Sequence, residues 1–168
     1  MLVGPAQSIS LESNHKYGSY MQMSRKHIIK LAVGVETIQQ FYDIQRPQII
    51  DYEGQTAVPC WTRYKPKESD AILDAEGSIY RVVKNRIICR HKILGFEIVE
   101  NTAKGTMCAI MQDAQMIETI AQPRRSFQGW RYLKESDAPA DKGIYTGGTI
   151  ADDIPEDMRA DLEAAGLL

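Results

Sequence analysis

The segment Gly77–Leu94, GSIYRVVKNRIICRHKIL, limits most strongly what this chain can fold into. It consists of two runs rich in β-branched residues, interrupted at Lys84-Asn85, and this pattern is typical of a β-hairpin. Asn tolerates a positive φ, so Lys84-Asn85 can form a two-residue turn between the runs. We therefore expect an antiparallel sheet built around this hairpin.

A two-residue turn also predicts which hairpin side chains share a face, because even positions of the first strand then lie beside odd positions of the second. A core-facing set is expected to comprise Tyr80, Val82, Ile87, Cys89, His91 and Ile93. A basic, partly wet set is expected to comprise Ile79, Arg81, Val83, Arg86, Ile88, Arg90 and Lys92. A basic sheet face beside aromatic residues suggests nucleic-acid binding.

The composition is that of a soluble globular protein with one domain. The chain has 168 residues, of which 43% are hydrophobic and 25% charged. It contains no apolar run long enough for a membrane span, and its N-terminus lacks the pattern of a secretory signal. The three cysteines, an odd number within apolar runs, predict free, buried thiols in a reducing compartment, so we expect a cytoplasmic protein.

The net charge of −2 conceals an uneven distribution along the chain. Residues 24–135 hold 17 Lys and Arg against 13 Asp and Glu, whereas residues 136–168 hold two basic and eight acidic residues. We expect a flexible N-terminal extension at 1–23, a folded domain at 24–141, and an acidic C-terminal extension with a short helix at 142–168.

Apolar spacing and turn residues predict about six short strands and three helices. The second run of the hairpin is expected to continue past Gly95 through 96–100. Further strands are expected at 27–33, 57–64, 106–112 and 124–134, and helices at 35–45, 69–73 and 155–165. Residues 113–122 fit either a helical turn or a strand, whereas 48–55 and 136–149 are expected to be loops. Pro59 indicates an edge or a bulge, and Gly95 a bulge. Because βαβ crossovers are missing, this order favours an α+β fold built as a small mixed β-barrel.

Several strings resemble an alphaproteobacterial family labelled only as a domain of unknown function. They are TRYKPK at 62–67, GSIYRVVKN at 77–85, PRRSFQGWRYL at 123–133 and DAPAD at 137–141, of which FQGWRY is the most specific. The family is similar to the PUA-like barrels, the superfamily that includes the ASCH and EVE domains. This resemblance implies a PUA-like barrel that binds RNA or modified bases. The chain departs from the family pattern at Arg81, where Trp is usual, and at Asn85, where the turn usually contains Gly.

Two segments interleave arginine with aromatic residues, which is the combination that phosphates and unpaired bases require. The predicted nucleic-acid-binding residues are Trp61, Arg63, Tyr64, Lys67, Arg81, Arg90, Arg124, Arg125, Gln128, Trp130 and Arg131. Any one of the large aromatic residues is more often part of a core than of a binding surface. The interleaving in two separate segments is what favours the binding hypothesis.

Other chemistry has little support in the sequence. Cys89 and His91 lie two positions apart, but no further ligands stand at the spacing of a zinc site, so no metal or other cofactor is expected. No phosphate-binding glycine motif is present, and no residue is assigned a catalytic role. Two alternatives to non-catalytic binding stay open. The first is a structural or interaction subunit that binds a protein partner through the acidic C-terminal helix, and the second is a small enzyme acting on a nucleotide-like substrate.

Overall fold

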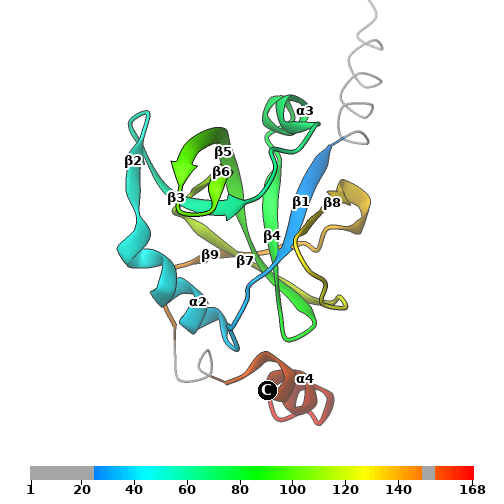
Figure 1. Cartoon of the computed structure of the whole chain (residues 1–168). Helices are drawn as coiled ribbons and strands as arrows, with labels where there is room; N and C mark the ends of the chain where they lie inside the picture. Colours follow the sequence, from blue (N-terminus) through cyan, green and yellow to red (C-terminus); the bar gives the residue numbers. More distant parts are fainter. Residues whose placement is uncertain (1–24, 149–153) are drawn as a thin grey trace, which may run out of the picture.

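A computed structural model of the chain describes residues 25–148 and 154–168; the predicted N-terminal extension lies outside these ranges. The fold is α+β and mostly β (Figure 1). In chain order the elements are β1 (Lys26–Leu31), α2 (Ile38–Gln45), the 3-10 turn η2 (Arg46–Gln48), β2 (Ile50–Tyr52), β3 (Gln55–Thr62), α3 (Ser69–Asp74), β4 (Ser78–Val83), β5 (Arg86–Thr102), β6 (Gly105–Asp113), β7 (Met116–Pro123), β8 (Trp130–Lys134), the 3-10 turn η3 (Glu135–Asp137), β9 (Asp141–Tyr145) and α4 (Glu156–Ala164).

The nine strands form one strongly bent sheet with two halves that share β5. The first half-sheet has the order β8-β1-β4-β5-β7-β9, and the second has the order β2-β3-β6-β5. All neighbours are antiparallel except β1 and β4, which are parallel. In the described part of the chain, β2 and β8 do not pair with each other, so the sheet does not close into the expected barrel.

The strand β5 is continuous over 17 residues and changes its partner along its length. Its first part pairs with β7 and its second part with β6, so that β6 and β7 together run beside it as one long antiparallel arm. The register shifts between Ile93 and Gly95, which confirms the bulge predicted at Gly95. A Cβ at Gly95 would lie 2.2 Å from the hydroxyl oxygen of Tyr52, so a side chain at this position would have to displace the Tyr52 ring.

The hairpin turn is confirmed, but the predicted division of its faces is wrong beyond Ile87. Lys84 and Asn85 both have positive φ, 47° and 60°, as a two-residue turn requires. A second irregularity places Arg81 opposite Cys89 and Val82 opposite Ile87, which leaves Ile88 as an extra residue. The side chains after Ile88 therefore share a face with Ile79 and Arg81 where Tyr80 and Val82 were predicted, and the reverse, although Cys89, His91 and Ile93 are buried as expected.

This bulge places Arg81 and Arg90, two of the three arginines expected together on the wet face, on opposite faces of the sheet. Arg81 lies on the inner face with Cys89 and His91 and is only 5% exposed. Its guanidinium donates to the side chain of Gln112 at 3.0 Å and lies 5.4 Å from the centre of the Phe41 ring. The prediction that Arg81 is accessible is therefore wrong.

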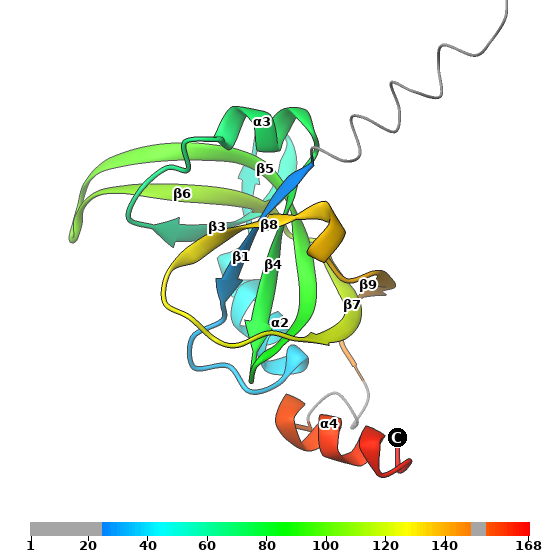
Figure 2. The ribbon, with the colours of Figure 1, turned by 90° about the vertical axis from the view of Figure 1, so that its right-hand side faces the viewer.

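Two hydrophobic clusters fill the inner, concave side of the bent sheet and a third lies on the outer face of the first half-sheet. The helix α2 adds Ile38 and Phe41 to one inner cluster, and the other joins Ile28 and Ile79 to the inner face of β6. The outer cluster is centred on Tyr80, and Phe127 and Ala138 from the segments on either side of β8 pack against it. Figure 2 shows how the loop before β8 and the segment after β8 run across the first half-sheet.

Several element predictions need correction. The expected loop at 48–55 contains β2, which pairs with β3 across a turn at Glu53-Gly54. The expected loop at 136–149 contains β9, and residues 113–122 mostly form β7. The expected strand at 124–134 is extended only from Trp130, because 124–129 forms a loop. Ser69 lies inside α3 rather than capping it. Pro59 does lie on an edge, since β2 pairs only with residues 55–57 of β3.

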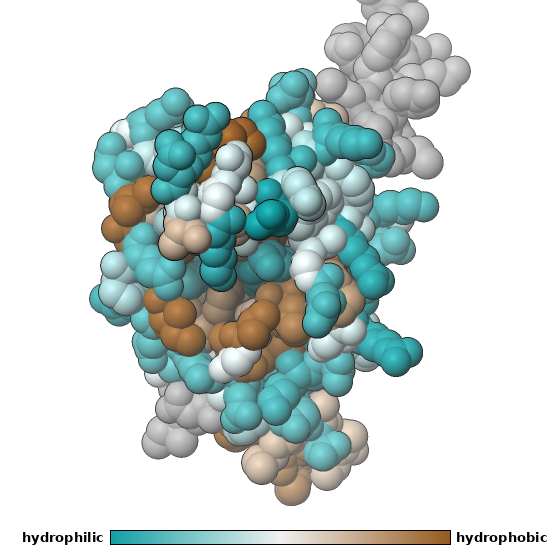
Figure 3. Space-filling view, in the orientation of Figure 1, coloured by the Kyte–Doolittle hydropathy of each residue, from teal (hydrophilic) through white to brown (hydrophobic). Residues whose placement is uncertain are grey.

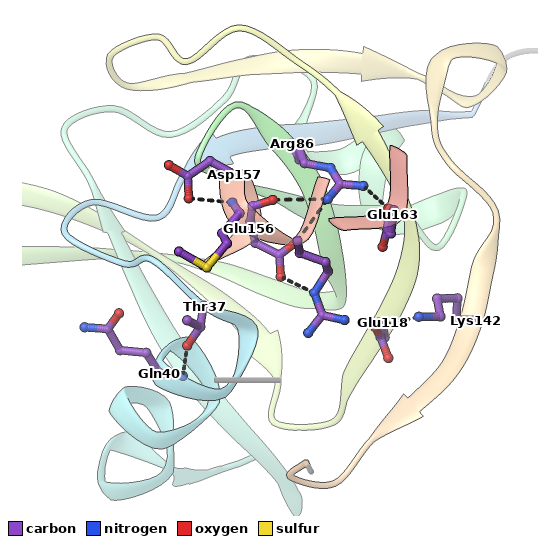
Figure 4. A network of polar contacts seen from close by, with 10 residues as sticks. Thr37, Gln40, Arg86, Glu118, Lys142, Glu156, Asp157 and Glu163 are labelled. Atoms are coloured by element: carbon purple, nitrogen blue, oxygen red, sulfur yellow. Dashed lines mark hydrogen bonds and ion pairs between the residues drawn. The ribbon is translucent and has the colours of Figure 1, made fainter. Parts of the chain in front are cut away.

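Charged contacts hold α4 against the first half-sheet (Figure 4). Arg86 donates to the backbone carbonyl of Glu156 at 3.2 Å and to the carboxylate of Glu163 at 3.1 Å. Glu156 is buried, and its burial raises the pKa of its carboxyl group. The apolar residue Met158 remains 54% exposed, so the described contacts of this helix are largely electrostatic.

Gly77 lets the end of α3 approach β1 closely. A Cβ at this position would lie 2.6 Å from the backbone carbonyl oxygen of Lys26 and 2.7 Å from Cγ2 of Ile72. Because one of these neighbours is backbone, we expect Gly77→Ala to lower the free energy of unfolding by about 1–3 kcal/mol. Urea denaturation measures this effect. Glu100→Ala, at an exposed position, serves as control and should change stability by less than about 0.5 kcal/mol; equal effects would contradict the packing argument.

Candidate functional site

The structure distributes the predicted nucleic-acid-binding residues over several environments. Arg124, Arg125 and Arg131 come together, and Gln128 is exposed on the same loop. Trp61, Arg63, Tyr64 and Lys67 are exposed on and after β3. Trp130 is half-buried, Arg81 is buried, and Arg90 is paired with an aspartate.

The first group forms a shallow cavity of about 480 Å³, here called the basic hollow, lined by Arg124, Arg125, Ser126, Phe127 and Arg131. The guanidinium groups of Arg131 and Arg124 lie 4.5 Å and 5.9 Å from the centre of the Phe127 ring. The side chain of Asn85 accepts hydrogen bonds from the backbone and hydroxyl of Ser126 and so fixes the loop to the hairpin turn. Within the described ranges, none of the three arginines forms an ion pair.

The second group lies beside the tip of the β5–β6 hairpin. Trp61 is 45% exposed and lines an apolar hollow of about 310 Å³ with Ala103, Lys104 and Met107 among others. Arg63 donates to the backbone carbonyl of Lys104 at 3.2 Å. Trp61 pairs across the sheet with Ala109 on the outer face of the second half-sheet, whereas Arg131 lies on the outer face of the first. The two groups are therefore separate surfaces.

Trp130 belongs to neither surface. It packs edge-on against Tyr132, with ring centres 5.0 Å apart, and contacts an inner hydrophobic cluster. Tyr132 accepts a hydrogen bond from the backbone N–H of Glu68 through its hydroxyl group. The aromatic pair therefore links β8 to the start of α3, and much of the Trp130 ring is used for packing.

A polar pocket of about 320 Å³ lies at the end of β1, β4 and β5 on the outer face of the first half-sheet. We call it the His27 pocket; it is lined by Arg25, His27, Glu76, Ser78, Tyr80, Arg90, Glu135, Ala138, Pro139, Ala140 and Asp141. One wall is the segment 135–141, which crosses from β8 to β9. A salt bridge or hydrogen bond from the sheet holds each end of this segment, through His27 at Glu135 and through Arg90 at Asp141.

The protonation state of His27 follows from its two partners. Its Nδ1 lies 2.9 Å from the backbone nitrogen of Ser78, which can only donate, so Nδ1 carries no proton. The proton of the neutral ring is therefore on Nε2, which donates to Glu135. Burial lowers the pKa of His27, and this effect exceeds the opposing influence of Glu135. His27 is thus neutral at pH 7, with both nitrogens engaged.

Arg90 and Asp141 form a two-pronged ion pair. The Nε and Nη2 atoms of Arg90 donate to the two carboxylate oxygens of Asp141 at 2.8 Å and 2.7 Å, and Nη1 donates to the hydroxyl oxygen of Ser78 at 2.8 Å. Arg90 lowers the pKa of Asp141, mainly through these hydrogen bonds. Arg90 therefore stabilises the crossing segment, and its predicted role in holding phosphate would require this pair to open.

The cysteines are free and buried, as predicted. Burial raises the pKa of Cys89 to about 12 and lowers that of His91 to about 4, so Cys89 is a thiol and His91 a neutral imidazole at pH 7. The described ranges contain no cluster of three or more His, Cys, Asp or Glu side chains that could hold a metal ion. None of the helices in these ranges is long and apolar enough to cross a membrane.

Sequence reasoning missed the His27 pocket as a unit. Its residues come from β1, β4, β5 and the crossing segment, and the bulge at Ile88 is what brings Arg90 beside Ser78. The sequence did contain a signal for this pocket: the segment 135–141 has an acidic residue at each end, Glu135 and Asp141, and each could pair with a basic or imidazole group. Their partners could not be identified without the register of the sheet.

The chain is thus an α+β protein with a bent, open sheet, and the basic hollow and the His27 pocket lie on the same half-sheet. The model of the family described as "Protein of unknown function (DUF1489)" matches residues 28–168, and the chain belongs to this family. The match includes the predicted C-terminal extension as well as the predicted domain. No curated protein and no solved structure matches the chain.

The lowered pKa of His27 predicts a pH-dependent stability. The unfolded state, with an ordinary histidine pKa near 6.5, binds a proton more readily than the folded state, so the free energy of unfolding should fall as the pH decreases below 6.5. Protonation would also remove the hydrogen bond from Ser78. Urea denaturation between pH 7 and 5 should show a weaker decrease for His27→Gln than for the unaltered protein, while His91 contributes equally to both. Identical pH profiles would contradict this assignment.

Proposed function

We propose that this protein binds single-stranded nucleic acid, RNA or DNA with an unpaired or modified base, in the bacterial cytoplasm and without catalysing a reaction. The observation that carries the proposal is the basic hollow, in which Arg124 and Arg131 lie against Phe127 beside Arg125, and none of the three arginines forms an ion pair within the described ranges. Phosphate groups require such cations, and neutralising phosphates supplies most of the sequence-independent affinity for nucleic acid.

The stacked arrangement of Arg131 on Phe127 suits an unpaired base as well as a phosphate. A guanidinium plane held 4.5 Å from an aromatic ring centre can offer its outer face to a base, and RNA-binding proteins use arginine planes in this way. Gln128 and Ser126 on the same loop supply groups for hydrogen bonds to base edges. This combination supports recognition of a flexible strand rather than of a regular duplex.

The surface around Trp61 is proposed as a secondary contact. Exposed Trp61 and Tyr64 offer faces on which bases could stack irrespective of sequence, and Arg63 and Lys67 stand close in the chain. Because this surface and the basic hollow face outward from different half-sheets, only a strand long enough to pass around the molecule could contact both. Short oligonucleotides are expected to use the basic hollow alone.

The proposed relation to PUA-like barrels rests on element order. The chain runs strand, helix, strand, short helix and glycine-led hairpin, from β1 through α2, β3 and α3 to the hairpin that starts at Gly77. This order is similar to that of the EVE arrangement. The open sheet and the additional strand β2 are departures that a relative of the barrel would have to accommodate.

A protein partner is the second candidate, supported by the apolar region around β2. Ile44, Ile49 and Ile50 are 42–45% exposed beside this short edge strand, and Figure 3 shows apolar side chains over β2 and beside α2. An enzymatic role has less support. His27 lines a pocket, but its two nitrogens are both engaged, so it offers no free general base.

The basic hollow predicts a defined salt dependence of binding. The double substitution Arg124→Gln, Arg131→Gln should weaken retention of single-stranded RNA or DNA. It should also reduce the slope of log affinity against log salt by about 1.4, because each lost phosphate contact contributes about 0.7. Fluorescence anisotropy with a labelled oligonucleotide at several salt concentrations measures both quantities.

A matched control removes two cations that acids already neutralise. Lys92 and Lys142 pair with Glu76 and Glu118 at 2.8 Å and 3.0 Å, so the double substitution Lys92→Gln, Lys142→Gln should leave the slope almost unchanged. If the unaltered protein shows no salt-dependent retention of single-stranded nucleic acid, or if both double variants lose the same affinity, the proposed function is wrong.

A further inference from the structure

The His27 pocket has the construction of a ligand site, independently of the basic hollow. Its volume of about 320 Å³ is at the lower end of the range for small-molecule sites. Its polar groups are held from two sides, by the sheet and by the crossing segment 135–141. Pro139 is buried in this segment, which restricts its backbone further.

Most charges that line the pocket are already satisfied within the protein. Arg90 is neutralised by Asp141 at 2.7 Å, and Glu76 pairs with Lys92 at 2.8 Å. His27 is neutral and donates its single N–H to Glu135. Among the described residues that line the pocket, Arg25 and Glu135 are the charged groups that have no oppositely charged partner within the described ranges.

Arg25 and Glu135 face the same cavity. No side-chain hydrogen bond or ion pair of Arg25 occurs with a residue of the described ranges, and Glu135 has no Lys or Arg partner there. They stand close together, since the backbone N–H of Glu135 donates to the carbonyl of Arg25 at 3.2 Å. The pocket therefore presents a cation beside an anion.

Tyr80 supplies the independent observation that points to a ligand. This residue is 4% exposed and lines the pocket, yet its hydroxyl has no hydrogen-bond partner among the residues that the structure describes. The hydroxyl oxygen is not among the fully enclosed side-chain atoms that lack a partner in the described structure, so it opens into the cavity, where a ligand can reach it. Burial raises the pKa of Tyr80 to about 12, so the hydroxyl keeps its proton at pH 7 and can donate as well as accept.

We propose that the His27 pocket binds a small zwitterion that carries a carboxylate beside an ammonium group, which is the chemistry of a free α-amino acid. The carboxylate lies at Arg25, the ammonium at Glu135, and the Tyr80 hydroxyl donates to or accepts from the same ligand. The hydroxyl hydrogen of Ser78 remains available too, because Arg90 uses only the oxygen of that group.

Charge explains why other ligand classes fit less well. A free anion such as phosphate would satisfy Arg25 but would be repelled by Glu135, and a simple amine would be repelled by Arg25. An apolar ligand would displace water from the Tyr80 hydroxyl and from both charges without replacing its hydrogen bonds, which is costly.

Saturation-transfer NMR with the full-length protein tests the proposal. The probes are glycine, L-serine and L-glutamine, with acetate, methylammonium, inorganic phosphate and uridine as comparators. We expect saturation transfer to at least one amino acid and at least tenfold weaker binding of every comparator. Tyr80→Phe should lower the affinity for that amino acid about tenfold, because a hydrogen bond to a charged group is lost.

The variants separate this site from the rest of the molecule. Removing the Tyr80 hydroxyl breaks no hydrogen bond of the described structure, so Tyr80→Phe should fold and should retain nucleic acid like the unaltered protein. Tyr64→Phe, at a 73% exposed position, is the matched control and should bind the amino acid normally. The proposal is overturned if no amino acid binds, if any comparator binds as tightly, or if Tyr80→Phe binds as tightly as the unaltered protein.

Discussion

The register of β5 against β4 is the constraint on which the rest of the structure depends. One extra residue, Ile88, reverses the facing of all later side chains in the first part of β5. It turns Cys89 and His91 into the interior and Arg90 outward, where it can pair with Asp141. A strand without this bulge would bury a second arginine and leave the crossing segment unattached at one end.

Several polar groups of the His27 pocket stabilise the fold, because they attach the segment 135–141 to the sheet. The segment 135–141 must cross the outer face of the first half-sheet to reach β9, and it contains few apolar side chains that could hold it there. His27 and Arg90 fasten its two ends, the first through a hydrogen bond to Glu135 and the second through a two-pronged, partly exposed ion pair with Asp141. The cavity is the space that remains beneath the attached segment.

Local patterns were sufficient for the elements with strong local signals. The hairpin turn, the bulge at Gly95, α2 and the buried thiols were predicted correctly, because each depends on residues close in the sequence. The strands β2 and β9 were missed, since both are short, polar and exposed, and pairing with a neighbouring strand rather than intrinsic preference makes them extended. The candidate site was predicted in part. Arg124, Arg125 and Arg131 lie together because one loop carries the first two beside the next strand, whereas Arg81 is buried.

The sequence by itself determined that this chain forms an α+β domain around a hairpin at Gly77–Leu94 and that arginine accompanies aromatic residues in two segments. Only the tertiary structure decided which of these arginines meet, which one is enclosed, and that a polar pocket exists. The physical reason is that successive side chains of a β-strand point to opposite faces of the sheet. A single bulge, which the residues around it do not predict, therefore changes the face on which each later charged side chain of the strand lies.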